Sequence, residues 1–118
     1  MWELDKNRPI CPQICEQICC LIANGQYKPN EKIPSVREIA IEAGVNPNTV
    51  QKALTVLSDQ GLLYSMRGQG MYVSENNGQA ADKIDEMKEK KTREYIEEMK
   101  SLGLDLTQIK KYVEEWNK

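Results

Sequence analysis

Amide and hydroxyl side chains gather at the start of one short amphipathic segment near the middle of the chain. Asn48, Thr49 and Gln51 are interleaved there with the apolar residues Val50 and Ala53. On a helix, this spacing places the polar side chains on the face opposite the apolar stripe. An asparagine or glutamine amide can pair with adenine through two hydrogen bonds, which gives about 1–3 kcal/mol of discrimination between bases. These residue types in this pattern indicate a helix face that can read base edges in a DNA groove.

Basic residues stand beside that segment and in the segments on either side of it. Lys52 directly follows the polar run and suits a phosphate contact, although a merely solvated lysine fits its position nearly as well. Arg37 follows Ser35 at the expected start of a helix, and Arg67 precedes Gly68 in a glycine-rich tetrapeptide. An arginine at such a tip can enter a narrow minor groove and read its shape. Both arginines are therefore predicted to contact DNA.

Two short helices separated by a tight turn are needed to position these side chains. Ser35 with Glu38 has the spacing of a capping box, which begins a helix, and Gly44 supplies the left-handed conformation that ends it. Asn46 is a suitable cap for the following helix, with Pro47 at its first position. The pattern predicts a helix-turn-helix in which the second helix is the recognition helix.

A hairpin follows the recognition helix, and another helix precedes the pair. Residues 62–66 and 71–73 have the pattern of short strands, joined by a tip whose glycines permit positive φ. Residues 12–24 carry an apolar helical stripe that ends before a glycine. The expected fold class is mainly α with a small β-hairpin: a winged helix-turn-helix domain over 1–73, a linker over 74–82 and a two-helix tail over 83–118.

The tail is highly charged, but each of its two expected helices has a narrow apolar stripe, and Asp105 with Gln108 repeats the capping-box spacing. Two such helices cannot bury their stripes alone, so a second copy is the simplest cover, and a small-molecule pocket between paired tails is a weaker alternative. The residues predicted to form the dimer interface are Ile84, Met87, Tyr95, Met99, Leu102, Leu106, Ile109, Val113 and Trp116.

The four cysteines are the other candidate for chemistry. Cys11, Cys15, Cys19 and Cys20 all lie within ten residues, which argues against a disulfide framework. Thiolates at a spacing of four on a helix could hold a soft metal ion or respond to oxidants. The same spacing describes small apolar residues that pack on one helix face, and the chain has no histidine. Packing is the favoured interpretation, so no metal or cofactor is expected, and a thiol- or metal-responsive regulator is kept as the alternative.

Composition limits the remaining classes. The net charge is −2, and residues 1–73 carry seven basic and seven acidic side chains, so few well-placed cations must provide any DNA affinity. Without histidine or a phosphate-binding glycine loop, an enzyme is the weakest interpretation. No apolar run is long enough to span a membrane, and the first residues do not have the pattern of a secretory signal. A cytoplasmic protein is expected.

The segments PSVREIA, AGVNPNTVQKAL and RGQGMYV together resemble the GntR family of bacterial winged-helix transcription factors, over roughly residues 8–73. The tail segment SLGLDLTQI is similar to that of the short YtrA-like branch, whose members lack a large effector domain and dimerise through two tail helices. The resemblance implies DNA-backbone contacts by Ser35 and Arg37, with a base contact by Arg37 also open. It also implies phosphate and major-groove contacts by Asn46, Asn48, Thr49 and Gln51, and minor-groove contacts by Arg67 and Gly68.

The chain departs from many members of that family at Pro47 and Gln51, two positions that are often basic, so a base preference cannot be transferred. The expected function is a homodimeric transcriptional regulator, with repression favoured, on a palindromic operator whose half-sites lie about 10 base pairs apart. The resemblance implies control of its own operon and of transporter genes. A winged helix used only for protein–protein contact is the rival function.

Overall fold

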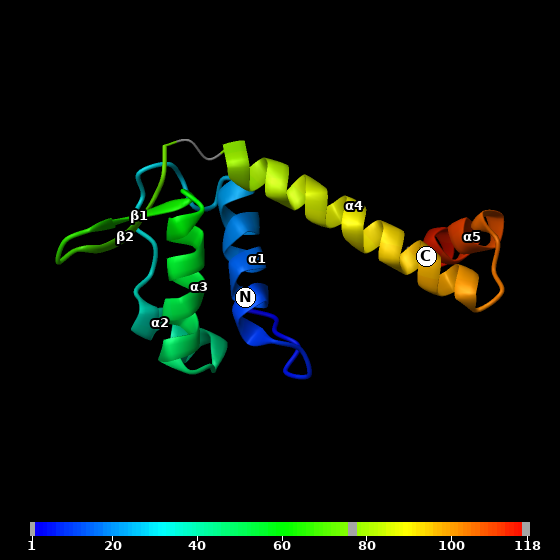
Figure 1. Ribbon diagram of the computed structural model, residues 1–118, viewed down its shortest axis with the longest axis horizontal. Helices are drawn as coiled ribbons and strands as arrows, with labels where there is room; N and C mark the ends of the chain where they lie inside the picture. The colour runs from blue at the N-terminus through cyan, green and yellow to red at the C-terminus, as the bar shows by residue number, and fades with distance from the viewer. Residues whose placement is uncertain (1, 76–77, 117–118) are drawn as a thin grey trace. The chain divides into compact units, whose positions relative to one another are not determined.

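The computed structural model describes residues 2–75 and 78–116 and divides into two compact units, Met1–Ile84 and Asp85–Lys118. The first unit contains helices α1 (Ile10–Ala23), α2 (Val36–Ala43) and α3 (Pro47–Asp59). They are followed by the antiparallel strands β1 (Leu63–Met66) and β2 (Gly70–Val73), which form a hairpin (Figure 1). The predicted fold class, a winged helix-turn-helix followed by a helical tail, is confirmed.

The core of the first unit lies between α1 and α3, with α2 and the hairpin packed around them. The apolar stripe predicted for each of the two longer helices is buried, because the helical period places its members on one side. These core residues are Ile14, Ile18, Leu21 and Ile22 on α1 and Val50, Ala53, Leu54 and Leu57 on α3.

The helix-turn-helix begins and ends where the capping residues predict. Ser35 and Glu38 form both hydrogen bonds of a capping box at the start of α2. Gly44 ends the helix with φ 68° and ψ 40°, a left-handed conformation that favours glycine. Asn46 then caps α3, and Pro47 occupies its first turn. The abrupt turn at Gly44 sets the direction in which α3 leaves α2.

The hairpin is joined by a third extended segment that the sequence did not reveal. Ile33 donates a backbone hydrogen bond to Met71 at 3.0 Å, and Val73 donates one to Glu31 at 2.9 Å, so residues 31–33 run antiparallel to β2. Because each bond joins segments about forty positions apart, no local pattern announces the pairing. Residues 31–33, which lead to α2, are thereby hydrogen-bonded to strand β2 of the wing.

Helix α4 (Gly78–Ser101) begins earlier than predicted, so the linker proposed over 74–82 is wrong for residues 78–82. The physical reason is burial: Ala80 is completely buried and Ile84, one turn later, is 8% exposed. The charge of Lys83 acts on the thiols of Cys15 and Cys19, which places this turn beside α1. The first turns of α4 therefore belong to the first unit.

The second unit contains the rest of α4 and helix α5 (Leu106–Trp116), which folds back along the end of α4 (Figure 1). Asp105 and Gln108 exchange two hydrogen bonds of 2.9 Å each, which confirms the predicted capping box of α5. Gly103 forms the turn between the helices with φ 94°.

None of the helices in the described part of the chain is both long enough and apolar enough to cross a lipid bilayer.

Candidate nucleic-acid interface

A groove of about 450 Å³ runs across the first unit where three elements of the winged helix meet. The start of α2, the outward face of α3 and the tip of the hairpin all border it. Its lining residues are Lys32, Ile33, Pro34, Ser35, Val36, Gln51, Leu54, Ser65, Gly68, Gln69, Gly70 and Met71. Three of the residues predicted from the sequence, Ser35, Gln51 and Gly68, line this groove, and Lys32 joins them without having been predicted.

The start of α2 presents one hydroxyl and one guanidinium. The Ser35 Oγ accepts a hydrogen bond of 3.1 Å from the Glu38 N–H, and the Glu38 carboxylate accepts one of 3.2 Å from the Ser35 N–H. These bonds hold the pKa of the Glu38 carboxyl below its usual value. Since Ser35 uses only an acceptor, its hydroxyl hydrogen is still available to a phosphate. Arg37, two residues after Ser35, is exposed and forms no ion pair within residues 2–75 and 78–116.

The start of α3 is built in a similar way. The Asn46 Oδ1 accepts a hydrogen bond of 2.8 Å from the Asn48 N–H, which leaves the Asn46 Nδ2 donors pointing at solvent. The Asn48 side chain is exposed, while Thr49 is half-buried against the domain. Asn46 and Asn48 thus present amide groups at the amino-terminal end of the recognition helix, where phosphates and base edges can be reached.

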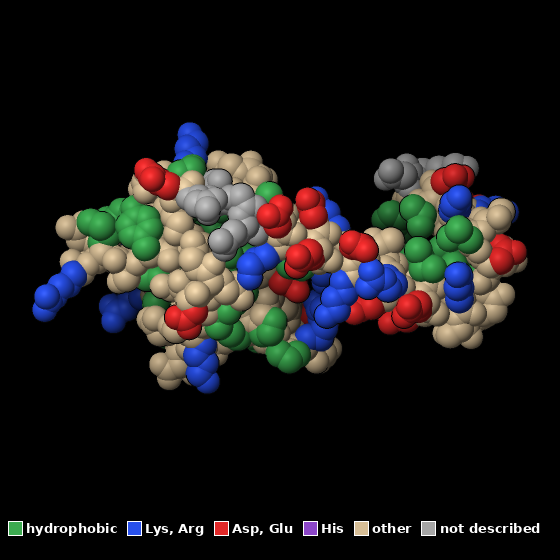
Figure 2. Space-filling view, turned by 45° about the horizontal axis from the view of Figure 1, so that its top comes forward, with side chains coloured by type: hydrophobic (Ala, Val, Ile, Leu, Met, Phe, Trp, Pro, Cys, Tyr) green, Lys and Arg blue, Asp and Glu red, His purple; other side chains and the backbone are tan. Residues whose placement is uncertain are grey.

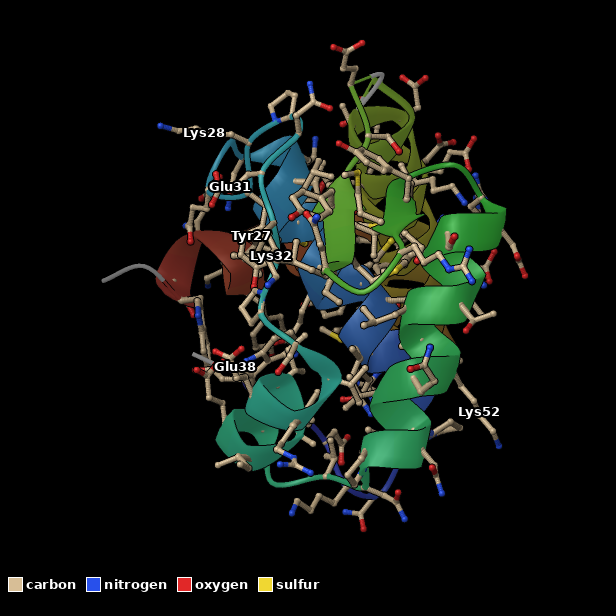
Figure 3. All side chains as sticks on the ribbon, turned by 90° about the vertical axis from the view of Figure 1, so that its left-hand side faces the viewer. Tyr27, Lys28, Glu31, Lys32, Glu38 and Lys52 are labelled. Carbon is tan, nitrogen blue, oxygen red and sulfur yellow. The ribbon has the colours of Figure 1, made fainter. Side chains whose placement is uncertain are left out.

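Gln51 and Lys52 lie one turn further along α3. Gln51 borders the groove, and its Nε2 makes only a long contact of 3.4 Å with the Thr55 hydroxyl. Such a contact is weak, so the amide can rotate to a base edge at little cost. Lys52 is exposed and projects from the side of α3, outside the lining of the groove (Figure 3).

The wing tip is formed by Arg67, Gly68 and Gln69 between the two strands. Gly68 has φ 76°, and the Gln69 N–H donates to the Met66 carbonyl at 2.9 Å, which closes the turn. Arg67 is exposed at this tip, as the predicted minor-groove role requires. Behind the tip, the rings of Tyr64 and Tyr72 stack with centroids 5.7 Å apart and stiffen the hairpin. Hydrophobic side chains gather over this hairpin in Figure 2.

The four cysteines lie on α1 and differ in burial. Cys19 is buried, Cys11 and Cys15 are half-buried, and Cys20 is exposed; all four thiols are free. The Cys15 thiol donates to the Ala53 carbonyl at 3.5 Å, and burial, followed by the neighbouring Cys11, raises its pKa to about 12. Among the residues that the structure describes, no three potential metal ligands are grouped together. The Cys15 contact attaches this face of α1 to the backbone of α3.

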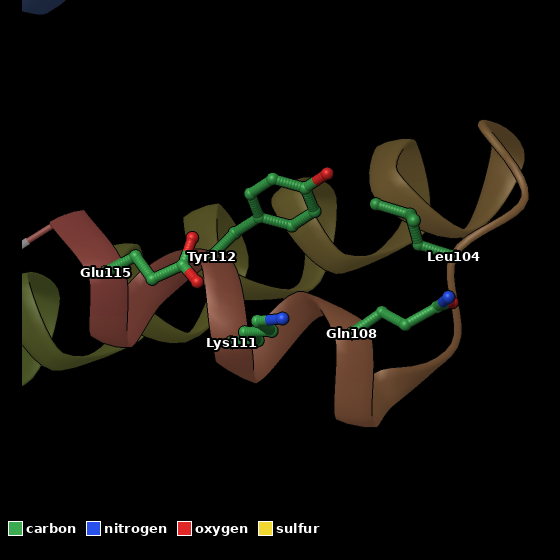
Figure 4. A pocket seen from close by; sticks show the side chains of 5 residues that line it. All are labelled: Leu104, Gln108, Lys111, Tyr112 and Glu115. Atoms are coloured by element: carbon green, nitrogen blue, oxygen red, sulfur yellow. The ribbon is translucent and has the colours of Figure 1, made fainter.

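The tail has a separate, apolar surface within the second unit. A groove of about 450 Å³ is lined by Tyr95, Met99, Tyr112, Val113 and Trp116. Tyr112 was not among the predicted interface residues, because it lies outside the stripe that the 3–4 spacing of α5 traces. A smaller, more polar hollow lies on the other side of Tyr112, bordered by charged and amide side chains (Figure 4).

The predicted interface residues differ in what they can offer to a partner. Leu102, Leu106, Val113 and Trp116 are exposed, and Met87, like Met99, is half-buried. Two of the predicted residues need correction: Ile84 is buried in the first unit, and Ile109 is 3% exposed within the second. Each therefore has little exposed surface with which to contact a second copy. Both residues therefore contribute to packing within the single chain.

Comparisons with known proteins match both the domain and the whole chain. The profile of the family described as bacterial regulatory proteins, gntR family, matches residues 12–73. The HTH-type transcriptional regulator YhcF of Bacillus subtilis is 38% identical over 106 residues, which cover 86% of this chain and 84% of YhcF. The HTH-type transcriptional repressor YtrA of the same organism is 46% identical over 70 residues, covering 59% of this chain and 54% of YtrA.

A solved structure extends the likeness to the tail. The structure of a GntR family transcriptional regulator from Listeria monocytogenes superposes with a TM-score of 0.78 at 32% identity, covering 95% of this chain and 98% of that one. The family profile covers the winged helix, and the solved structure also covers the tail helices described above. The chain belongs to the GntR family of bacterial transcriptional regulators, in its YtrA-like branch, and is a DNA-binding protein and not an enzyme.

Proposed function

We propose that this regulator represses transcription in the cytoplasm by binding, as a homodimer, to a palindromic operator. The observation that carries the proposal is the groove between α2, α3 and the wing, where exposed donors and cations from three elements face outward together. In this arrangement α3 enters the major groove, and Asn48, Thr49 and Gln51 meet base edges. Ser35, Arg37, Asn46 and Lys52 hold phosphates, while Arg67 and Gly68 reach the minor groove.

The exposed apolar groove of the tail supports the dimer. Trp116 is 89% exposed, and Tyr112 and Val113 are each more than half exposed, although all three have large, mainly hydrophobic side chains. A contiguous patch of this kind on a small unit is typical of an interface. A second copy related by a two-fold axis would cover the same patch on both chains and would present two winged domains. The two domains then match half-sites about one helical turn apart.

Repression is supported by the relatives whose names state it. YtrA is a repressor by name, and it is 46% identical to this chain over 70 residues. A dimer on an operator that overlaps a promoter excludes polymerase by occupancy alone, without any further domain. Control of its own operon and of transporter genes rests on the family resemblance.

Selection of bound duplexes from a random pool, with reduced protein at near-physiological salt, tests the proposal. A dimeric reader should recover a palindrome with half-sites about 10 base pairs apart, and its affinity should fall steeply with salt. Arg37→Ala and Arg67→Ala should each weaken binding, because each removes a cation from the DNA-facing side. Recovery of single, unpaired half-sites would contradict the dimer. Failure to enrich any sequence would favour a winged helix that binds protein.

A further inference from the structure

We propose that Lys32 contacts a DNA phosphate at the base of the wing, between the hairpin and the start of α2. The proposal rests on DNA binding by this domain and adds a residue to those that the motifs indicate. Lys32 is exposed and borders the same groove as Ser35, Gln51 and Gly68 (Figure 3). A lysine in this place can hold the sugar–phosphate backbone that runs between the recognition helix and the wing.

The backbone holds Lys32 in place more firmly than its loop position suggests. The residue pairs with Tyr72 of β2 in an antiparallel bridge, and both of its neighbours bond to that strand: Ile33 donates to Met71, and Glu31 accepts from Val73. Its main chain is therefore paired with the wing, although it lies in the segment that leads to α2. A cation attached at this junction keeps a fixed position relative to both DNA-contacting elements.

Gly70 provides the space for the lysine stem. A Cβ atom built on Gly70 would lie 3.2 Å from the Lys32 Cε, a distance tighter than ordinary van der Waals contact. The aliphatic chain of Lys32 thus passes across β2 where that strand has no side chain. The stem packs on the backbone while the ammonium extends beyond it, as long lysine side chains commonly do.

The charges around the ammonium leave it available. The charge of Lys32 acts on Glu38, whose pKa is lowered mainly by hydrogen bonds from Ser35 and to a smaller degree by Lys32. The Glu38 carboxylate is already held by the Ser35 N–H. No carboxylate lies within 4 Å of the Lys32 Nζ in the described segments. Within the described segments, the ammonium thus has no carboxylate partner that a phosphate would have to displace.

Lys32 could instead act only through Glu38, by supporting the cap of α2. The two roles differ in their dependence on salt. A phosphate contact releases a counterion, so losing it makes log K depend less steeply on log salt, by about 0.9 per contact. A weakened cap lowers the stability of the domain and the affinity, but it leaves the number of phosphate contacts, and hence that slope, unchanged.

The experiment measures binding of the full-length protein to the selected operator and to a duplex of scrambled sequence, by fluorescence anisotropy over a series of salt concentrations. Lys32→Ala should weaken binding to both duplexes by about eightfold per bound half-site at 0.1 M salt, the factor that a slope of 0.9 gives. Its salt slope should be shallower by about 0.9 per half-site. Lys32→Arg keeps the charge and should bind nearly as wild type does.

Lys28→Ala is the matched control, because Lys28 is an exposed lysine of the same loop that does not border the groove (Figure 3). It should leave both the affinity and the slope close to wild type. An unchanged slope in Lys32→Ala, or an equal loss in Lys28→Ala, would overturn the proposed contact. If the wild-type protein bound neither duplex, operator binding itself would fail together with it.

Discussion

Replacing Trp116 with alanine should separate the proposed dimer into single chains. Trp116 is the last residue of α5 in the described segment, and its side chain is 89% exposed beside Val113 and Tyr112. Alanine has a higher helix propensity than tryptophan, so the change should not unfold α5. It removes the largest apolar side chain of the groove and leaves the winged domain untouched.

The expected magnitude follows from the exposed area. A tryptophan side chain of about 250 Å² that is 89% exposed offers about 220 Å² for burial. At about 25 cal/mol per Å², complete coverage would stabilise a dimer by about 5 kcal/mol per copy, which is an upper bound. A symmetric interface counts the residue twice. Even if only a quarter of this area is covered, the loss is about 2.5 kcal/mol, or about 60-fold in the dissociation constant of the dimer.

Sedimentation velocity over a wide range of protein concentrations measures this constant directly. Ile41→Ala is the matched control, because Ile41 is a large apolar residue that is 75% exposed on α2 in the other unit. It should leave the dimer intact. Trp116→Ala should also lose the preference for a full palindrome over a single half-site. A variant that sediments like wild type at every concentration would show that this face of the tail is not the interface.

Four further changes test the site and the core. Ser35→Ala should lower the free energy of unfolding by about 1 kcal/mol in urea titrations, because the first turn of α2 loses its cap. The pKa of the Glu38 carboxyl is lowered from 4.5, so the stability that its ionised form contributes is present above that pH and is lost as the pH falls through the folded pKa. The difference in free energy of unfolding between wild type and Glu38→Gln should therefore shrink in acid. Because the pKa of the Cys15 thiol is raised from 9.0 to about 12, its neutral form stabilises the fold, and this stabilisation should decline as the pH rises between those values. Cys15→Ala should not show this decline. Alkylation followed by mass spectrometry should label the exposed Cys20 first. Gln51→Ala should broaden the selected operator at one base position while leaving the salt slope unchanged, and an altered slope with the same operator would contradict base reading.

Local signals predicted most of the winged domain. The capping box at Ser35, the left-handed Gly44 and the cap at Asn46 are each set by residues within four positions of one another, so their patterns are visible in the sequence. The buried stripes of α1 and α3 follow from helical periodicity for the same reason. Such features depend on residues that are close together in the sequence and not on contacts with distant segments.

Features that depend on distant contacts could not be predicted in this way. The early start of α4 depends on the burial of Ala80 in the first unit, and the lysine beside the groove depends on pairing between Lys32 and Tyr72. Ile109 was placed at the dimer interface because its spacing matched the stripe, yet the fold of the tail buries it. Periodicity identifies an apolar face, but it cannot divide that face between the core of one chain and a partner.

The balance of charge over residues 1–73 raises the question of how a winged domain of zero net charge binds DNA. Much of the answer lies in what its acidic side chains already do. The Asp5 carboxylate pairs with Arg8 at 3.1 Å, the Glu42 carboxylate accepts from the Trp2 indole at 3.3 Å, and Glu38 is held in the cap of α2. Each of these carboxylates is engaged in a local contact.

The cations of the DNA-facing side are not occupied in that way. Arg37, Lys52 and Arg67 are exposed, and in the segments that the structure describes none of them has a carboxylate within 4 Å. With Lys32, each winged domain then offers four cations, and a dimer offers eight, which corresponds to a salt slope of about −7 if every one meets a phosphate. A measured slope near zero would mean that the equal number of basic and acidic side chains, and not the placement of the cations, decides the affinity for DNA.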